Sequence, residues 1–322
     1  MEGMGPRAVA RSFPTIDRYA LLGGTGFVSD DTEQTALVAQ SLARHPTDLD
    51  ACLRSFRKAL LGWFLRLPWG IGWGTLKACL KIALGFRKTG TSSAGNGAAM
   101  RAAILGAFHF DDAERRRTWS DAVARVTHED RRAVEGARFV AELASNLVTR
   151  SPDDARQVPV EAAAETVEEG RIRASIAAAI ELAGKGASLD DAVAALGNTG
   201  FVLHTVGIST FCFLRYGGDP GEAIVSAIRA GGDTDSNAAI VGAWVGALHG
   251  EQGLPCRLVE KLNDGPFGRT HLRALASDLV AARSGSPSSE ARYSAVYALL
   301  RNLLLYPVVL VHAVRVGVRG PR

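Results

Sequence analysis

The feature that most constrains this chain is a series of alanine-rich segments whose apolar residues recur at helical spacing. Glycine pairs such as Gly217-Gly218 and Gly231-Gly232 separate several of them, as is common at helix ends. Runs in which β-branched and polar residues alternate, the pattern of strands, are almost absent. We therefore predict an all-α bundle. The expected helices cover residues 31–44, 100–108, 131–148, 161–183, 189–196, 220–230, 238–248 and 271–282.

The length of 322 residues allows one large domain or two small ones, and 47% hydrophobic residues suffice for a sizeable core. The helical pattern favours one compact domain over residues 1–283. A Ser/Gly/Pro linker at 284–290 and an apolar segment at 291–322, helix-like over 291–319, are expected to follow. That last segment could pack on the domain or make peripheral contact with a membrane surface. Its Leu/Val content, with few basic residues on one face, favours packing.

The net charge and the positions of the cysteines indicate which binding partners and which cellular compartment to expect. The net charge is only +4 and the basic residues are scattered, so no nucleic-acid partner is expected. The four cysteines lie far apart, in or beside apolar segments, which predicts buried free thiols in a reducing compartment. The N-terminus lacks the apolar core of a secretion signal, and the longest apolar run, 303–311, is too short to span a membrane. We expect a cytoplasmic monomer without a transmembrane segment.

Two acidic motifs stand far apart in the sequence: Ser29-Asp30-Asp31-Thr32-Glu33 and Gly231-Gly232-Asp233-Thr234-Asp235-Ser236. Each precedes a helical segment, where Asp and Ser are common N-caps, and the first resembles a capping box. Capping needs only one acid, whereas each motif crowds two. A divalent cation would relieve this repulsion, and carboxylate and hydroxyl oxygens suit Mg²⁺, Mn²⁺ or Ca²⁺. The residues favour a metal site over capping.

A third motif is a loop of small residues, 92–101, that runs directly into a helical segment. Backbone N–H groups at such a helix start can bind a phosphate, although an ordinary loop is the alternative. His128 lies at another expected helix start, next to Thr127. By itself this histidine would be a cap or a surface residue.

Together these pieces resemble the ADP-ribosylglycohydrolases, the relatives of the dinitrogenase reductase-activating glycohydrolase. The resemblance covers about residues 20–280, and its most specific element is the Gly-Gly-Asp-Thr-Asp-Ser-Asn motif at 231–237. The matching pieces, in the family's order and rough spacing, are Ser29-Asp30-Asp31-Thr32, the loop at 95–101, Thr127-His128, the segment at 200–205 and the motif at 231–239.

The resemblance implies a compact orthogonal helical bundle with two Mg²⁺ or Mn²⁺ ions at the base of a cleft. The implied enzyme is a hydrolase that cleaves the C1″ glycosidic bond of ADP-ribosylated protein side chains or of ADP-ribose derivatives. The implied metal ligands are Ser29, Asp30, Asp31, Asp233, Asp235 and Ser236, with Asp30 and Asp31 catalytic and Asp235 the bridge. The implied substrate-binding residues are Gly95, Asn96, Gly97, Ala98, His128 and Phe201, with the loop on the diphosphate. Whether the acceptor is arginine, serine or a free ADP-ribose ester stays open.

Two alternatives remain at this level. The family usually opens with a Gly-Asp-Ala-Leu-Gly helix, and nothing before Ser29 matches it. From this difference we expect the chain to bind metal and ADP-ribose but to hydrolyse slowly or not at all. It could then be an ADP-ribose-binding protein that has lost catalysis, or a structural protein whose acids are helix caps.

Overall fold

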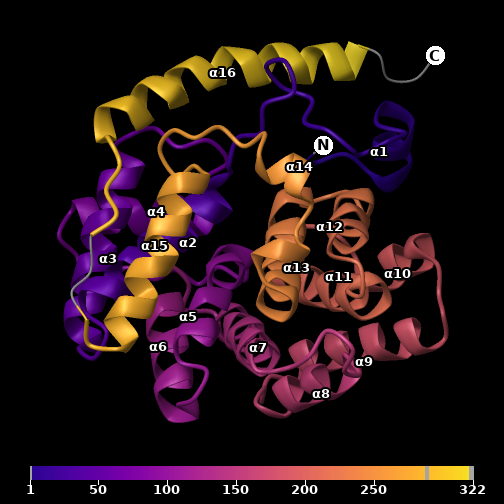
Figure 1. Cartoon of the computed structure of the whole chain (residues 1–322), viewed down its shortest axis with the longest axis horizontal. Coiled ribbons are helices and arrows are strands. Elements are labelled where there is room, and N and C mark those ends of the chain that lie inside the picture. The colour runs from indigo at the N-terminus through magenta and orange to yellow at the C-terminus, as the bar shows by residue number, and fades with distance from the viewer. Residues whose placement is uncertain (1, 287–289, 319–322) are drawn as a thin grey trace. The chain divides into compact units, whose positions relative to one another are not determined.

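A computed structural model describes residues 2–286 and 290–318, and within them the regular structure is helical (Figure 1). These residues form sixteen α-helices and two short 3₁₀ helices, with only isolated β-bridges between loops. The predicted all-α class is confirmed. Residues 287–289 of the expected linker and 319–322 of the expected last segment lie outside the described residues.

The chain divides into two compact units. Unit 1 comprises Met1–Pro6 and Gly72–Pro255, and unit 2 comprises Arg7–Ile71 and Cys256–Arg322. The helices of unit 1 are α4 (Trp73–Ala83), η1 (Asn96–Arg101), α5 (Ala103–Phe108), α6 (Ala113–Arg125), α7 (Arg131–Val148), α8 (Gln157–Glu165), α9 (Gly170–Gly184), α10 (Leu189–Leu196), α11 (Val202–Tyr216), α12 (Pro220–Arg229), α13 (Thr234–His249) and η2 (Glu251–Gly253). Those of unit 2 are α1 (Pro6–Ser12, whose first residue belongs to unit 1), α2 (Asp30–Arg44), α3 (Leu49–Phe64), α14 (Cys256–Val259), α15 (Arg269–Arg283) and α16 (Ala295–Val318).

Unit 1 is built around α7, which buries residues along most of its length. The Trp244 ring of α13 contacts Phe139 of α7 and Phe213 of α11, and its indole N–H donates to the Val140 carbonyl over 3.1 Å. A Cβ at Gly106 would overlap the Ala141 carbonyl, so only glycine allows α5 this close to α7. This packing holds the starts of η1, α11 and α13 in fixed positions.

Unit 2 centres on α2, which packs against α3 and α15 through buried residues such as Leu37 and Leu42. Burying such side chains contributes roughly 2 kcal/mol each. The last helix, α16, joins this unit through one face. Its Asn302 amide donates to the Arg66 carbonyl over 2.8 Å, and its Tyr306 hydroxyl donates to the Pro68 carbonyl over 3.1 Å.

One expected helix is wrong. The segment 161–183 forms two helices, α8 and α9, rather than one. The buried carboxylate of Glu135 accepts the backbone N–H groups of Glu168 and Glu169, each over 2.6 Å, which turns the chain between the helices. Glu169 then caps α9 by accepting the Ile172 N–H. The periodicity continues through this turn because the interruption comes from a tertiary contact.

The cysteine prediction is correct for three residues and wrong for one. Cys52, Cys79 and Cys212 are buried free thiols, and burial raises the pKa of each to about 12. Cys256 is exposed instead. It begins the short helix α14, whose described residues are not buried, so the apolar segment beside it does not cover it.

Candidate active site

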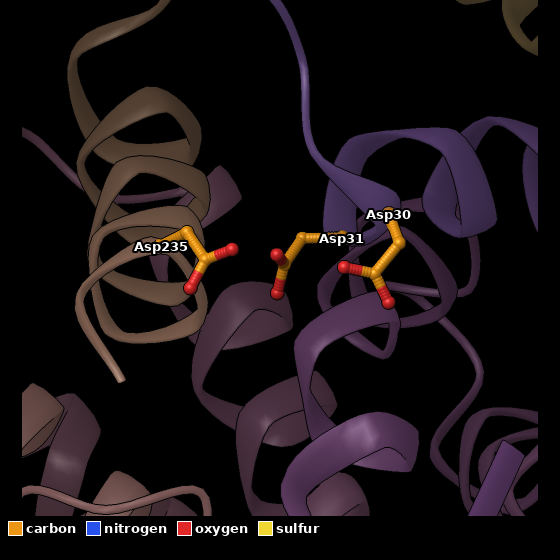
Figure 2. Close-up of side chains that lie close together, drawn as sticks. All are labelled: Asp30, Asp31 and Asp235. Atoms are coloured by element: carbon orange, nitrogen blue, oxygen red, sulfur yellow. The ribbon is translucent and has the colours of Figure 1, made fainter. Parts of the chain in front are cut away.

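The first acidic motif forms the opening turn of α2 in unit 2. Asp30 and Asp31 are both buried there, and Figure 2 shows their carboxylates at the start of the helix. The Ser29 hydroxyl donates to Asp31 over 2.6 Å, and the Gln34 amide donates to Asp30 over 3.1 Å. At Gly70, where φ is +84°, a Cβ would lie 2.9 Å from the nearer Asp30 oxygen. Glycine at that position leaves room for the carboxylate.

Glu33, the third acid of this turn, has a different role. Its carboxylate accepts the Trp63 indole N–H over 2.6 Å and forms a buried ion pair with Arg301 of α16. It therefore does not close the capping box that the sequence suggested. A buried carboxylate paired in this way fixes the first turn of α2 against α3 and α16.

The second acidic motif forms the start of α13 in unit 1. Gly231 and Gly232 both have positive φ, and a Cβ at Gly232 would overlap the Asn198 carbonyl oxygen. The Asp233 N–H donates to that same carbonyl over 2.8 Å. The glycine pair is thus required for the chain to pass Asn198 and place the acids. Asp235 lies in the first turn of α13, as Figure 2 shows.

Neither acidic motif caps its helix with its N-cap side chain. Ser29 and Asp233 are the N-cap residues of α2 and α13, and neither side chain accepts a cap hydrogen bond. Other acidic or hydroxyl residues at helix starts do cap. Side chains that accept a backbone N–H in this way are Asp48, Asp112, Asp130, Glu169, Ser188 and Asp219. The N-cap side chains of the two motifs therefore lack the capping role that these six side chains have in the described chain.

The glycine loop joins the second motif within unit 1. The Asn96 amide donates to Asp233 over 2.9 Å and to the Thr205 hydroxyl over 3.0 Å. The Asn96 backbone N–H donates to the Gly200 carbonyl over 3.0 Å, and Gly95 and Phe201 form an antiparallel bridge. The loop, the Phe201 segment and the start of α13 are thus tied together by hydrogen bonds.

His128 is buried beside this loop. Burial and the nearby Arg101 charge lower the pKa of His128 to about 3, so the ring is neutral at pH 7. The Thr127 hydroxyl accepts from Arg101 over 2.6 Å and lies 2.7 Å from His128 Nδ1. The Thr127 hydroxyl thus links the Arg101 guanidinium to Nδ1 of the ring, whose other nitrogen is Nε2.

Three glycines surround that Nε2 atom. A Cβ would lie 2.7 Å from it at Gly74, 3.4 Å at Gly97 and 3.7 Å at Gly95. The missing side chains leave space beside this nitrogen of the neutral ring. Arg101 also donates to the Gly97 carbonyl over 2.7 Å, which fixes the loop beside the ring.

A sequence model of the ADP-ribosylglycohydrolase family matches residues 1–288. The chain belongs to the ADP-ribosylglycohydrolase family. It is 31% identical over 245 residues to an uncharacterized protein of Archaeoglobus fulgidus, covering 74% of this chain and 76% of that protein. Its fold is similar to an ADP-ribosylglycohydrolase-related protein complex, with a TM-score of 0.61, 23% identity, and coverage of 79% of this chain and 81% of that one.

Membership of the ADP-ribosylglycohydrolase family makes glycosyl hydrolysis the general activity class. The residues implied by the resemblance lie in both units. Asn96, Phe201 and Asp233 are brought together in unit 1, with His128 beside Gly97. The residues of the first motif, Ser29 to Asp31, lie together in unit 2.

Sequence reasoning missed the residues that support this site. Thr127 links Arg101 to the His128 ring, and Thr205 accepts from the Asn96 amide. All three stand inside segments that carry the resemblance, so their positions were a usable signal. Arg301 carried no comparable signal, because it lies 268 positions from the Glu33 that it contacts.

Proposed function

We propose that this chain is a metal-dependent hydrolase that cleaves the C1″ glycosidic bond of ADP-ribosylated protein side chains or of ADP-ribose derivatives. Family membership supports the reaction class. The observation that carries the metal part is that the N-cap side chains of the two acid-rich helix starts, Ser29 and Asp233, accept no cap hydrogen bond, whereas those of six other helix starts do. Both starts also carry carboxylates in their first turn, whose oxygens are suited to a metal ligand role.

The donor set fits a hard divalent cation. Asp30, Asp31 and Asp235 offer carboxylate oxygens of the kind that could hold a metal ion. Oxygen-only ligands of this type select Mg²⁺ or Mn²⁺ over zinc. We propose two such ions, with ligands from both motifs: Ser29, Asp30, Asp31, Asp233, Asp235 and Ser236. When bound, the ions would polarise a water molecule and hold ribose hydroxyl groups.

Residues of the chain itself would orient the attacking water, stabilise the developing charge and position the metal ligands. Asp30 or Asp31 would orient the attacking water and stabilise positive charge that develops at C1″. Their hydrogen bonds from Ser29 and Gln34 support this role because they fix the carboxylate orientation. Asn96 would keep Asp233 in position through its amide.

The glycine loop and His128 would bind the diphosphate. The Gly95 N–H donates to the Ser93 hydroxyl, and the Asn96 N–H donates to the Gly200 carbonyl. We therefore assign the proposed phosphate contacts to the N–H groups of Gly97 and Ala98. His128 would add a neutral N–H donor from Nε2. A neutral donor binds the anion without the desolvation cost of a buried cation.

Phe201 would contact the adenosine part of the ligand. It is partly exposed, and the Arg132 guanidinium lies over its ring at 5.4 Å from the centroid. An arginine in this position fixes the ring through a cation–π interaction and leaves the ring available for stacking.

Thermal unfolding with and without Mg²⁺ tests the metal proposal. An ion that binds only the folded state stabilises it by RT ln(1 + [L]/Kd), or about 2.7 kcal/mol at a hundredfold excess over Kd. The melting temperature should rise with Mg²⁺, and Asp235→Asn should remove the rise. The matched control is Asp219→Asn, because Asp219 is an acid in a helix start that does cap. It should leave the Mg²⁺ response intact. A wild-type melting curve that ignores millimolar Mg²⁺ and Mn²⁺ would contradict the proposal.

A further inference from the structure

The last helix, α16 (yellow in Figure 1), exposes apolar side chains and buries polar ones, which is the reverse of the usual arrangement in a globular protein. Val296, Leu300, Leu304 and Leu310 are exposed by 69%, 52%, 69% and 63%. At 100° per residue these side chains lie on one face of the helix. The other exposed members of that face are Leu303, Pro307, Val311 and Val314. Among the residues of α16 whose exposure is described, this outward face is apolar.

The inward face of α16 carries its polar residues. Arg301 and Asn302 are buried, and Arg301 pairs with Glu33 and donates to the Pro266 carbonyl over 2.9 Å. Asn302 donates to the Arg66 carbonyl. These bonds fix the rotation of the helix, so the apolar face cannot turn inward without breaking a buried ion pair.

A neighbouring segment of unit 2 extends the apolar surface. Leu65 and Leu67 are exposed by 66% and 50%, and Trp69 is partly exposed beside Tyr306, with ring centroids 5.0 Å apart. Leu67 is held at a positive φ of 52°, a conformation that leucine rarely adopts. Trp and Tyr side chains are typical of the boundary between lipid and water.

The segments that contain these exposed apolar side chains also lack acidic residues. Residues 291–322 contain five arginines and no Asp or Glu, and residues 51–110 contain nine basic residues and no Asp or Glu. Of the twenty large hydrophobic side chains exposed in the described chain, sixteen fall in these two acid-free segments. They include Trp73, Leu80, Leu84 and Phe86 around α4 of unit 1. The exposed apolar groups thus occur mainly in the two segments whose charged residues are all basic, and two of these residues, Arg301 and Arg292, pair with acids outside the segments, Glu33 and Glu290.

We infer that the apolar face of α16, together with Leu65, Leu67 and Trp69, docks on an anionic lipid surface, with the helix lying in the interface. An apolar helix face with basic residues nearby is the composition that binds such surfaces. Pairing of α16 with a second copy would bring together two segments whose charged residues are all arginines. This inference goes beyond the proposed hydrolysis and does not depend on it.

A spanning arrangement has less support. The stretch Ala295–His312 is long and apolar enough to cross a membrane by length and composition alone, and 22% of it is buried in the protein. The sequence prediction of no such segment considered only uninterrupted apolar runs. Crossing a bilayer would withdraw Arg301 from Glu33 and place it among lipid chains, which is costly.

Vesicle co-sedimentation tests the inference with the full chain. The protein should pellet with phosphatidylcholine vesicles that contain phosphatidylglycerol, and less with phosphatidylcholine alone or in high salt. The triple variant Leu300→Ser, Leu304→Ser, Leu310→Ser should lower the partition coefficient at least about tenfold. The matched control is Val158→Ser with Val280→Ser, which changes exposed valines outside the acid-free segments and should bind as the wild type does.

The alternatives give different results. No pelleting with anionic vesicles, or equal pelleting of the triple variant and the wild type, would overturn the inference. So would a concentration-dependent dimer in gel filtration that the triple variant abolishes without any vesicle binding, which would assign the face to a second copy. Resistance to extraction by alkaline carbonate would indicate a spanning helix instead. Equal melting temperatures of all variants would show that the exposed substitutions leave the fold intact.

Discussion

Lowering the pH from 7 to 5 should destabilise this protein through His128. The side chain is 2% exposed, and burial together with the Arg101 charge lowers its pKa to about 3. In the unfolded chain a histidine has a pKa of about 6.5. Between these two values the unfolded state binds a proton that the folded state does not. The stabilisation is therefore complete above the unfolded pKa and is lost as the pH falls towards 3.

The size of the effect follows from these two pKa values. At pH 5 the unfolded histidine is almost fully protonated while the folded one is almost fully neutral, and integration from pH 7 gives a loss of about 2 kcal/mol. This result changes little if the folded pKa is about 4, because both values lie below the working pH.

Urea unfolding at pH 7 and pH 5, in wild type and in His128→Gln with chelator present, isolates this contribution. Glutamine does not titrate and keeps an acceptor for the Thr127 hydroxyl. The wild type should lose about 2 kcal/mol more than the variant between the two pH values. The same pH dependence in both proteins would show that His128 does not contribute to the loss of stability. The His128 Cε1 proton resonance gives a second readout, and a titration midpoint near 6.5 would contradict the lowered pKa independently.

Three further changes test other parts of the structure. Gly97→Val should place a branched side chain against His128 and lower ADP-ribose affinity in a folded protein, and unchanged binding by calorimetry would remove the loop from the site. Glu33→Gln should leave the buried Arg301 without a charged partner and cost about 3–5 kcal/mol in urea unfolding, unlike an exposed pair, whose loss would be nearly neutral. Gly232→Ala should force a Cβ into the Asn198 carbonyl at a positive φ and cost at least about 1 kcal/mol, whereas an unchanged unfolding midpoint would show that the turn can relax.

The fold class could be predicted from periodicity because most helices have one apolar face on a single core. The expected ranges 131–148 and 189–196 match α7 and α10 at both ends. The prediction of a single helix over 161–183 was wrong because Glu135, more than thirty positions before Glu168 and Glu169, accepts the backbone N–H groups of these two residues in the turn between α8 and α9. Local sequence does not contain that contact. Among the longer helices, α3, α4, α6 and α11 were not predicted, and most of α3 and all of α4 lie in the aromatic and basic stretch between Asp50 and Asp111.

The candidate site could be predicted in part. Its chemical groups stand in short motifs, so the acids, the glycine loop and His128 were found from the sequence. How these groups are used depends on contacts between distant segments. Glu33 has the spacing of a capping box but pairs with Arg301, and His128 is linked through Thr127 to Arg101. Neither Arg301 nor Arg101 can be identified as such a partner from the spacing of residues within a motif.

The proposed hydrolase activity is tested by ADP-ribose release from ADP-ribosyl-arginine and ADP-ribosyl-serine peptides by the full chain. We predict release from at least one peptide that requires Mg²⁺ or Mn²⁺ and falls at least about a hundredfold in Asp31→Asn. Asp219→Asn should retain the wild-type rate, because that acid only caps α12. If the wild type binds Mg²⁺ and ADP-ribose yet releases nothing from either peptide, the hydrolase assignment is contradicted and the chain is an ADP-ribose-binding protein.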